Sequence, residues 1–122
     1  PPQPRCEDLL VTTMLIKMGF STKLGGYSYL VDAIPIYAKD PSQAITKELY
    51  VAVGQIHGKD AGLVERSIRS AIDKAWRVGD PAVWSKYFRC LPDGTVERPS
   101  NGNFIARMAQ LLLGRSQESF IA

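Results

Sequence analysis

The stretch GLVERSIRSAIDKAW, residues 62–76, carries two opposite faces on one expected helix. On a wheel of about 100° per residue, the apolar residues fall on one side, which we expect to be buried: Val64, Ile68, Ala71, Ile72 and Ala75. The other side is mostly polar: Gly62, Arg66, Arg69, Ser70, Asp73 and Arg77, with Glu65 and Trp76 at one edge and Leu63 and Lys74 toward the other. Asp60 can cap such a helix and Gly79 can stop it, so the pattern predicts a helix over about 61–78.

Five further helices are expected on either side of this one. The preceding helix covers about 42–57, with Ser42 as its cap and Gly58 at its end. Apolar spacing predicts two earlier helices, over about 7–18 and 27–38, the second with a kink at Pro35. Two later helices cover about 81–88 and 101–114, and Asp93-Gly94 indicates a loop or small hairpin between them. The predicted fold is all-α, with about six helices and a central helix-turn-helix formed by 42–57 and 61–78.

The composition indicates one globular domain in 122 residues, with 45% apolar and 22% charged residues. We assign residues 1–6 to a linker or leader, 7–114 to the helical domain and 115–122 to a C-terminal tail. The net charge of +3 and the pI near 9.0 suit a nucleic-acid or acidic partner without requiring one. No membrane-spanning run and no signal peptide is recognisable, so we expect a cytoplasmic protein.

Residue types for metal or catalytic chemistry are sparse. Cys6 and Cys90 are expected to be free thiols, and His57 is expected to have a structural role, so neither a metal nor another cofactor is predicted. No phosphate-binding loop, nucleophile elbow or carboxylate pair with a histidine partner is found, which argues against an enzyme. The aromatic residues are expected to form a core cluster: Trp76, Trp84, Tyr87 and Phe88.

The polar face of 61–78 has two interpretations from spacing alone. It can be a solvated face, steadied by Glu65 with Arg69 and Asp73 with Arg77, each pair worth about 0.2 to 0.5 kcal/mol. It can also be a DNA-reading face, because the second helix of a helix-turn-helix presents its N-terminal residues to the major groove. There, arginine can donate twice to guanine and glutamate can accept from cytosine. Both interpretations remain open on these grounds.

Four motifs, which follow one another along the chain, favour one of these two interpretations. VERSIRSAIDKAW is similar to V-E-R-x-I-R-x-A-I-x-x-A-W in the C-terminal effector domain of the master response regulator of sporulation initiation in endospore-forming bacteria. GFSTKLGGYSYL, ITKELY and RPSNGNFIA resemble that family's G-[VIF]-x-x-x-x-x-G-Y-x-Y-L, I-T-K-x-L-Y and K-P-[TS]-N-x-x-F-I-A. The likeness runs from about Leu9 to Leu112. It implies an all-helical, sequence-specific DNA-binding domain that regulates transcription within a two-component system.

The resemblance also implies the site. Glu65 and Arg66 would touch bases and Arg69 would lie within reach of DNA; Ser70, on the same face, and Leu63, on the leading turn, complete the expected set of base contacts. Leu63 stands where the family commonly has a basic residue, so we expect a changed DNA preference. Phosphate contacts are expected from Lys23, Lys47, Lys59 and Lys74, whose alternative role is only to keep the surface hydrated.

Two further departures from the family pattern are Pro35 in the helix over 27–38 and Gly54 in the helix over 42–57. The glycine should lower helix propensity by about 1 kcal/mol relative to alanine.

Partners implied by the resemblance are double-stranded DNA, a second copy on tandem sites, and an RNA polymerase sigma factor near Ser85 to Glu97. Family members also carry a phosphorylated receiver domain, for which these 122 residues have no counterpart. We therefore expect either a piece of a longer regulator or a relative that is controlled differently. The alternative function is a helical protein-interaction module that has lost specific DNA readout, with Leu63 as its main argument.

Overall fold

The computed structural model describes residues 6–88, 92–93 and 96–121, with side chains described between Leu9 and Gly114. This part of the chain is all-helical and has no β-strand, which confirms the predicted class. Its elements are α1 (Cys6–Lys17), α2 (Gly25–Lys39), the π-helix η1 (Ile45–Leu49), α3 (Tyr50–His57), α4 (Ala61–Val78), α5 (Pro81–Tyr87) and α6 (Asn101–Ile121). Cys90, which was predicted to be a free thiol, Gly94 of the predicted Asp93-Gly94 turn and most of the proposed leader lie outside the described residues.

The starts of α4, α5 and α6 follow from capping residues in the sequence. The Asp60 carboxylate accepts from the Gly62 amide at 3.0 Å, and the Asp80 carboxylate accepts from the Ala82 amide at 2.9 Å. The Ser100 hydroxyl accepts from the Asn103 amide at 3.2 Å, at the start of α6. These bonds satisfy amides that have no partner within the helix, so α4, α5 and α6 begin close to where they were predicted.

The start of the third helix differs from the prediction. Ser42 is not its cap, because the Ser42 hydroxyl donates to the Asp40 carboxylate at 2.5 Å and the Ser42 amide bonds the same oxygen. The helix starts instead at Ile45 with one wide π-turn, in which the Leu49 amide donates to the Ala44 carbonyl at 3.1 Å. Local bonding within the Asp40 turn thus competes with capping.

The predicted end of the sixth helix was also wrong. Helix α6 continues through Gly114 to Ile121, so the expected tail is helical up to that residue. A glycine weakens a helix without ending it where, as at Gly114, its backbone keeps ordinary dihedral angles. Helix α1 begins at Cys6, close to its predicted start but inside the proposed linker, whereas α2 covers the predicted helix and continues through the buried Pro35 to Lys39.

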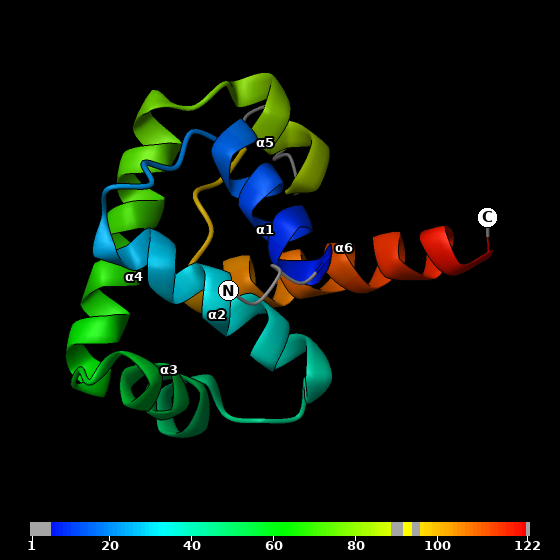
Figure 1. Ribbon diagram of the computed structural model, residues 1–122. Coiled ribbons are helices and arrows are strands. Elements are labelled where there is room, and N and C mark those ends of the chain that lie inside the picture. The colour runs from blue at the N-terminus through cyan, green and yellow to red at the C-terminus, as the bar shows by residue number, and fades with distance from the viewer. Residues whose placement is uncertain (1–5, 89–91, 94–95, 122) are drawn as a thin grey trace.

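Helix α2 lies at the centre of the molecule and packs against both α4 and α6 (Figure 1). Helix α1 covers part of α2 and α6, whereas η1 and α3 pack together beside the N-terminal end of α4. Gly26 permits the close crossing of α2 and α4, because an added Cβ would lie 2.1 Å from the Ser67 carbonyl oxygen. In the described ranges, no helix has the length and apolar character needed to cross a membrane.

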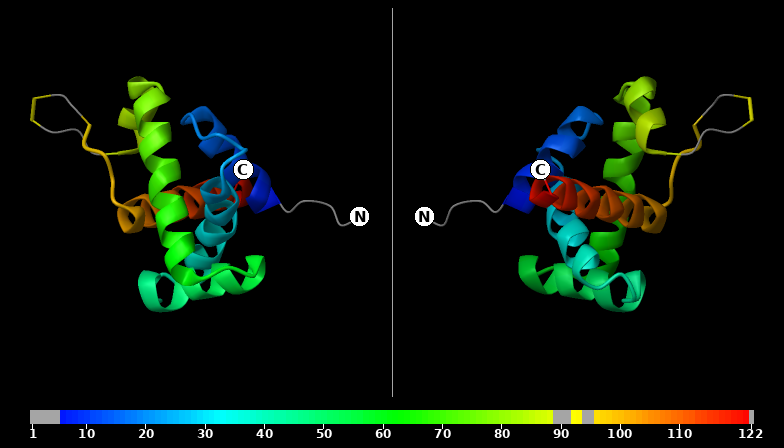
Figure 2. Two further views of the ribbon diagram at one scale, coloured as in Figure 1. Left: turned by 90° about the vertical axis from the view of Figure 1, so that its left-hand side faces the viewer. Right: turned by 90° about the vertical axis from the view of Figure 1, so that its right-hand side faces the viewer.

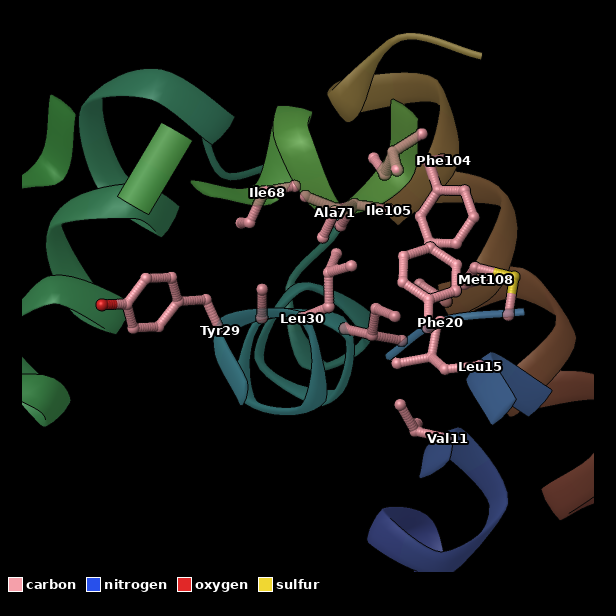
Figure 3. Packing of buried hydrophobic residues seen from close by; sticks show 14 of the residues in the cluster. Val11, Leu15, Phe20, Tyr29, Leu30, Ile68, Ala71, Phe104, Ile105 and Met108 are labelled. Carbon is pink, nitrogen blue, oxygen red and sulfur yellow. The ribbon is translucent and has the colours of Figure 1, made fainter. Parts of the chain in front are cut away.

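The core forms where these helices meet (Figure 3). All five residues predicted on the inner face of α4 are buried: Val64, Ile68, Ala71, Ile72 and Ala75. Ile68 and Ala71 face Leu30 of α2, while Phe20 lies beside Phe104 of α6, with ring centroids 5.3 Å apart. The buried face of α4 thereby fixes which side of the helix remains outside.

The aromatic residues pack as predicted. Trp84 is 1% exposed, its ring lies edge-on to Trp76 at 5.2 Å, and its Nε1 donates to the Met18 carbonyl at 3.0 Å. Phe88 and Tyr87 are partly buried against the same core. His57 is half-buried, with Nε2 2.5 Å from Asp32 Oδ2 and its ring edge against Tyr29, in agreement with a structural role.

Candidate nucleic-acid interface

Helices α3 and α4 are joined by a three-residue turn, Gly58 to Asp60. Gly58 has φ of 66°, a left-handed conformation that glycine adopts easily, and the Lys59 amide donates to the Gly54 carbonyl at 2.8 Å. A Cβ on Gly54 would lie only 2.4 Å from the Lys59 carbonyl oxygen. Gly54, which by sequence alone is a weakness in the helix, therefore lets the turn lie directly against α3.

The outer face of α4 is open on the side shown in the left view of Figure 2, where α4 stands in front of α2 and α6. Arg66, Arg69 and Ser70 are exposed along this face, and Glu65 is partly buried at its edge. Leu63, on the first turn, is 36% exposed. The five predicted base contacts therefore lie on one helix, in its N-terminal half.

Ion pairs distinguish the arginines of α4. Arg69 Nη2 lies 2.5 Å from Glu65 Oε1, and Arg77 Nη2 lies 3.1 Å from Asp73 Oδ2, as predicted from the i,i+4 spacing. Arg66 has no ion pair among the described residues. Its Nη1 lies over the first turn, 3.2 Å from the point that a Cβ on Gly62 would occupy. The Arg66 guanidinium is therefore an exposed positive group at the leading end of α4 that has no ion pair among the described residues.

The segment that leads into α6 braces one flank of α4. Asn101 Nδ2 donates to the Glu65 carbonyl at 3.1 Å and to the Tyr50 hydroxyl at 3.2 Å. Arg98 Nε lies 3.4 Å from Asp73 Oδ1, and its Nη2 donates to the Arg69 carbonyl at 3.4 Å. No local pattern in the sequence marks these positioning residues, because contacts between residues about 30 to 50 positions apart leave no local periodicity. Their one sequence signal is membership of the motif RPSNGNFIA.

Tyr50 lies beneath this flank of α4. Its side chain is buried, and burial raises the pKa of the Tyr50 hydroxyl above its ordinary value of 10.0. The Asn101 hydrogen bond opposes this increase in pKa, the Glu65 carboxylate adds to it and the Arg69 guanidinium opposes it. The Tyr50 side chain beneath the Glu65 edge of α4 is therefore an uncharged phenol at neutral pH.

Two shallow hollows run along α4. One lies between α4 and the start of α2, lined by Leu24, Gly25, Gly26, Arg66, Ser67, Ser70 and Ala71. The other lies beside η1 and the start of α6, lined by Thr46, Tyr50, Glu65, Arg69, Arg98, Ser100, Asn101 and Gly102. Helix α4 therefore projects between two depressions, and a helix with this shape can fit into a groove.

The four predicted phosphate contacts are all exposed and lie on different elements around α4. Lys59 is in the turn before α4, and Lys23 immediately precedes the first hollow. Lys47 follows Thr46 of the second hollow, and Lys74 lies farther along α4 itself. Positive charge therefore lies at the head of α4 and at chain positions next to the linings of both hollows.

A family model described as Sporulation initiation factor Spo0A C terminal matches residues 11–112. The chain belongs to this family. The match starts within α1, ends within α6 and includes every element between them. Members of the Spo0A C-terminal family are DNA-binding regulatory domains, not enzymes, so this chain is a DNA-binding domain of sporulation initiation. In the described part of this Spo0A C-terminal domain, no three His, Cys, Asp or Glu side chains are grouped as a metal site would require.

Proposed function

We propose that this domain binds DNA sequence-specifically, with α3 and α4 as a helix-turn-helix and α4 in the major groove. The observation that carries the proposal is the exposed Arg66, which has no ion pair among the described residues and lies on the leading half of α4, the helix that follows the three-residue turn. The major groove is about 12 Å wide and accepts a helix, and its base edges distinguish all four base pairs. Arg66 then donates two hydrogen bonds to one guanine.

Glu65 and Arg69 have a second role in this proposal. Their ion pair holds both side chains at one edge of α4, where Glu65 can accept from cytosine and Arg69 can reach a base or phosphate. An exposed ion pair of this kind contributes only about 0.3 to 0.5 kcal/mol to the free energy of unfolding, so breaking it to form DNA contacts costs little free energy. Ser70 lies one turn beyond Arg66 and completes the proposed contact surface.

The lysines supply the sequence-independent part of the affinity. Lys59 lies at the head of α4, whereas Lys23 and Lys47 lie on opposite flanks, where the two phosphate backbones bordering the groove would run. Each phosphate neutralised releases condensed counterions, so binding should weaken steeply with salt. Lys74 extends the same contact along α4.

We further propose that two copies occupy tandem sites and that a sigma factor contacts the surface near Ser85 to Glu97. Support for both comes from the family likeness, and for the second also from the exposure of Ser85, Lys86 and Glu97. Sedimentation with one-site and two-site duplexes tests the first. Cross-linking between this surface and a purified sigma factor tests the second.

The competing function is a helical protein-interaction module without specific DNA readout. The observation that favours it is the exposed Leu63 on the leading turn, where a hydrogen-bonding side chain would suit base readout better. Selection from random duplexes, followed by fluorescence anisotropy of the selected and a scrambled duplex over a salt series, separates the two functions. The DNA-reading function requires preference for the selected duplex at every salt concentration, whereas equal affinity for both duplexes would contradict it.

A further inference from the structure

Leu63 is the exposed large apolar side chain at the leading end of α4. It lies on the first turn of α4, two residues after the helix begins, and is 36% exposed. Its neighbours on the leading turn are Gly62, which has no side chain, and Arg66, whose guanidinium lies over Gly62. An apolar group and a paired hydrogen-bond donor therefore stand side by side at the end of α4 that enters the groove in the proposed function.

The major groove offers one apolar group on unmodified DNA, the C5 methyl of thymine. A leucine cannot satisfy a base-edge donor or acceptor, so opposite an amino group or a carbonyl oxygen it would displace water without replacing the lost hydrogen bond. Opposite a methyl group, the same contact removes apolar surface from water on both partners. Of the chemical groups on the base edges, the thymine methyl group is therefore the one that suits Leu63.

We propose that Leu63 reads the C5 methyl group of a thymine adjacent to the guanine that Arg66 contacts. This inference rests on the proposed groove binding and adds a specificity-determining residue to it. Random-sequence selection is then expected to enrich a thymine, on either strand, next to the guanine whose readout is lost on changing Arg66. The exposed leucine becomes part of the DNA-reading surface and no longer argues against it.

Deoxyuridine tests the proposal, because it pairs like thymine but lacks the methyl group. Each thymine of the selected duplex is replaced singly by deoxyuridine, and the dissociation constant is measured by anisotropy. The unsubstituted protein should bind one such duplex about three- to fivefold more weakly, the effect of about one methyl transfer. Leu63→Ala should bind the thymine and deoxyuridine duplexes equally at that position. Val78→Ala, which alters another exposed apolar residue at the far end of α4, should keep the full difference.

A second arm separates the methyl group from the rest of thymine. With cytosine at the same position, 5-methylcytosine should bind the unsubstituted protein more tightly than cytosine, and Leu63→Ala should abolish the difference. Urea midpoints of the two variants establish that both are folded, as expected for changes at exposed positions.

The possible results separate the assignment of Leu63 from the proposed groove binding on which it depends. If the selected duplex is preferred over the scrambled one but no deoxyuridine weakens binding, the assignment of Leu63 is overturned and the groove binding stands. A deoxyuridine penalty that persists in Leu63→Ala assigns the methyl to another residue and also overturns it. Equal affinity for selected and scrambled duplexes removes the proposed function, and the inference with it.

Discussion

Two arginines on α4, three residues apart, differ in what surrounds them. Arg69 is paired with Glu65 and its carbonyl accepts from Arg98, whereas Arg66 has no ion pair within the described residues. Both side chains have the same chemistry, so the difference in role must come from the partners. At the scale of the residue, the free guanidinium is the one we expect to discriminate between bases.

Changing Arg66 should therefore reduce specificity more than general affinity. Arg66→Ala is expected to weaken binding to the selected duplex by about 1 to 3 kcal/mol and to relax one base position. Arg66→Lys keeps the charge but loses the planar pair of donors, so it should relax the same position while keeping the salt dependence. Anisotropy against single-base variants of the duplex measures both effects. A uniform loss over all sequences would place Arg66 on the phosphates instead.

Lys59 should behave in the opposite way. Lys59→Ala is expected to weaken all duplexes alike and to reduce the slope of log affinity against log salt by about 1, because one phosphate contact is lost. Lys17→Ala, at the exposed end of α1, is the matched control and should leave the slope unchanged. Titrations at several salt concentrations test the pair. An unchanged slope for Lys59→Ala would leave this lysine with a hydration role only.

The packing around the turn between α3 and α4 explains why position 54 is a glycine, although helix propensity alone disfavours glycine there. Gly54 lies inside α3, yet the Lys59 carbonyl approaches so closely that no side chain fits there. The element that positions α4 is thus the whole unit of α3, Gly58 and the Asp60 cap. Helix α4 starts at a defined angle because the turn is packed against α3 and does not merely connect the two helices.

Replacing Gly54 should destabilise the domain although alanine is the better helix former. Gly54→Ala gains about 1 kcal/mol in propensity but must displace the turn, an overpacking strain of about 1 to 3 kcal/mol or more. Gly114→Ala, within α6 and with no atom within 4 Å of the added Cβ, is the matched control and should raise stability by about 0.5 to 1 kcal/mol. Urea unfolding of both variants provides the comparison. Equal stabilisation by the two changes would contradict the tight turn.

Three distant parts of the chain meet beneath the outer face of α4, the proposed DNA-contact surface. Tyr50 at the start of α3, Glu65 of α4 and Asn101 at the start of α6 are linked through the amide of Asn101. At the scale of the whole molecule, α6 is therefore a brace for α4 as well as a core helix. The orientation of the proposed contact surface depends on residues that do not touch DNA.

This arrangement predicts a loss of stability at alkaline pH. Burial raises the pKa of Tyr50 in the folded state, so above about pH 10 the unfolded chain releases a proton that the folded protein retains. The contribution of this group to the free energy of unfolding is full below pH 10 and is lost as pH rises through the folded-state pKa. Tyr27, whose pKa is also raised by burial, acts in the same direction.

Tyr50→Phe isolates the contribution of this phenol. Its urea midpoint should fall less between pH 9 and 11 than that of the unsubstituted protein, because one titrating group has been removed. Tyr37→Phe is the matched control, since Tyr37 is a partly buried tyrosine on α2. Parallel declines for Tyr50→Phe and the unsubstituted protein would show that other groups cause the alkaline loss.

Local chemistry in the sequence determined the helical class, the starts of α4, α5 and α6 and the two faces of α4. Asp60, Asp80 and Ser100 act through bonds to amides two or three residues away, and the apolar spacing of α4 follows from 3.6 residues per turn. Such features depend on neighbours in the chain, so the sequence displays them. Ser42 and the end of α6 were predicted wrongly because a competing local bond and an ordinary helical glycine look like boundary signals.

Only the tertiary structure decided which polar residues stay available and how α4 is held. The bonds from Arg98 and Asn101 to α4, the fit of Gly54 against the turn, and the hollows bordering α4 all join residues that are brought together by packing. The sequence predicted that Arg66, Arg69 and Glu65 share a surface; the structure shows that Arg66 is the one of these three without an ion pair in the described chain. Periodicity specifies the direction in which a side chain points, but its partners depend on long-range packing, which no local pattern contains.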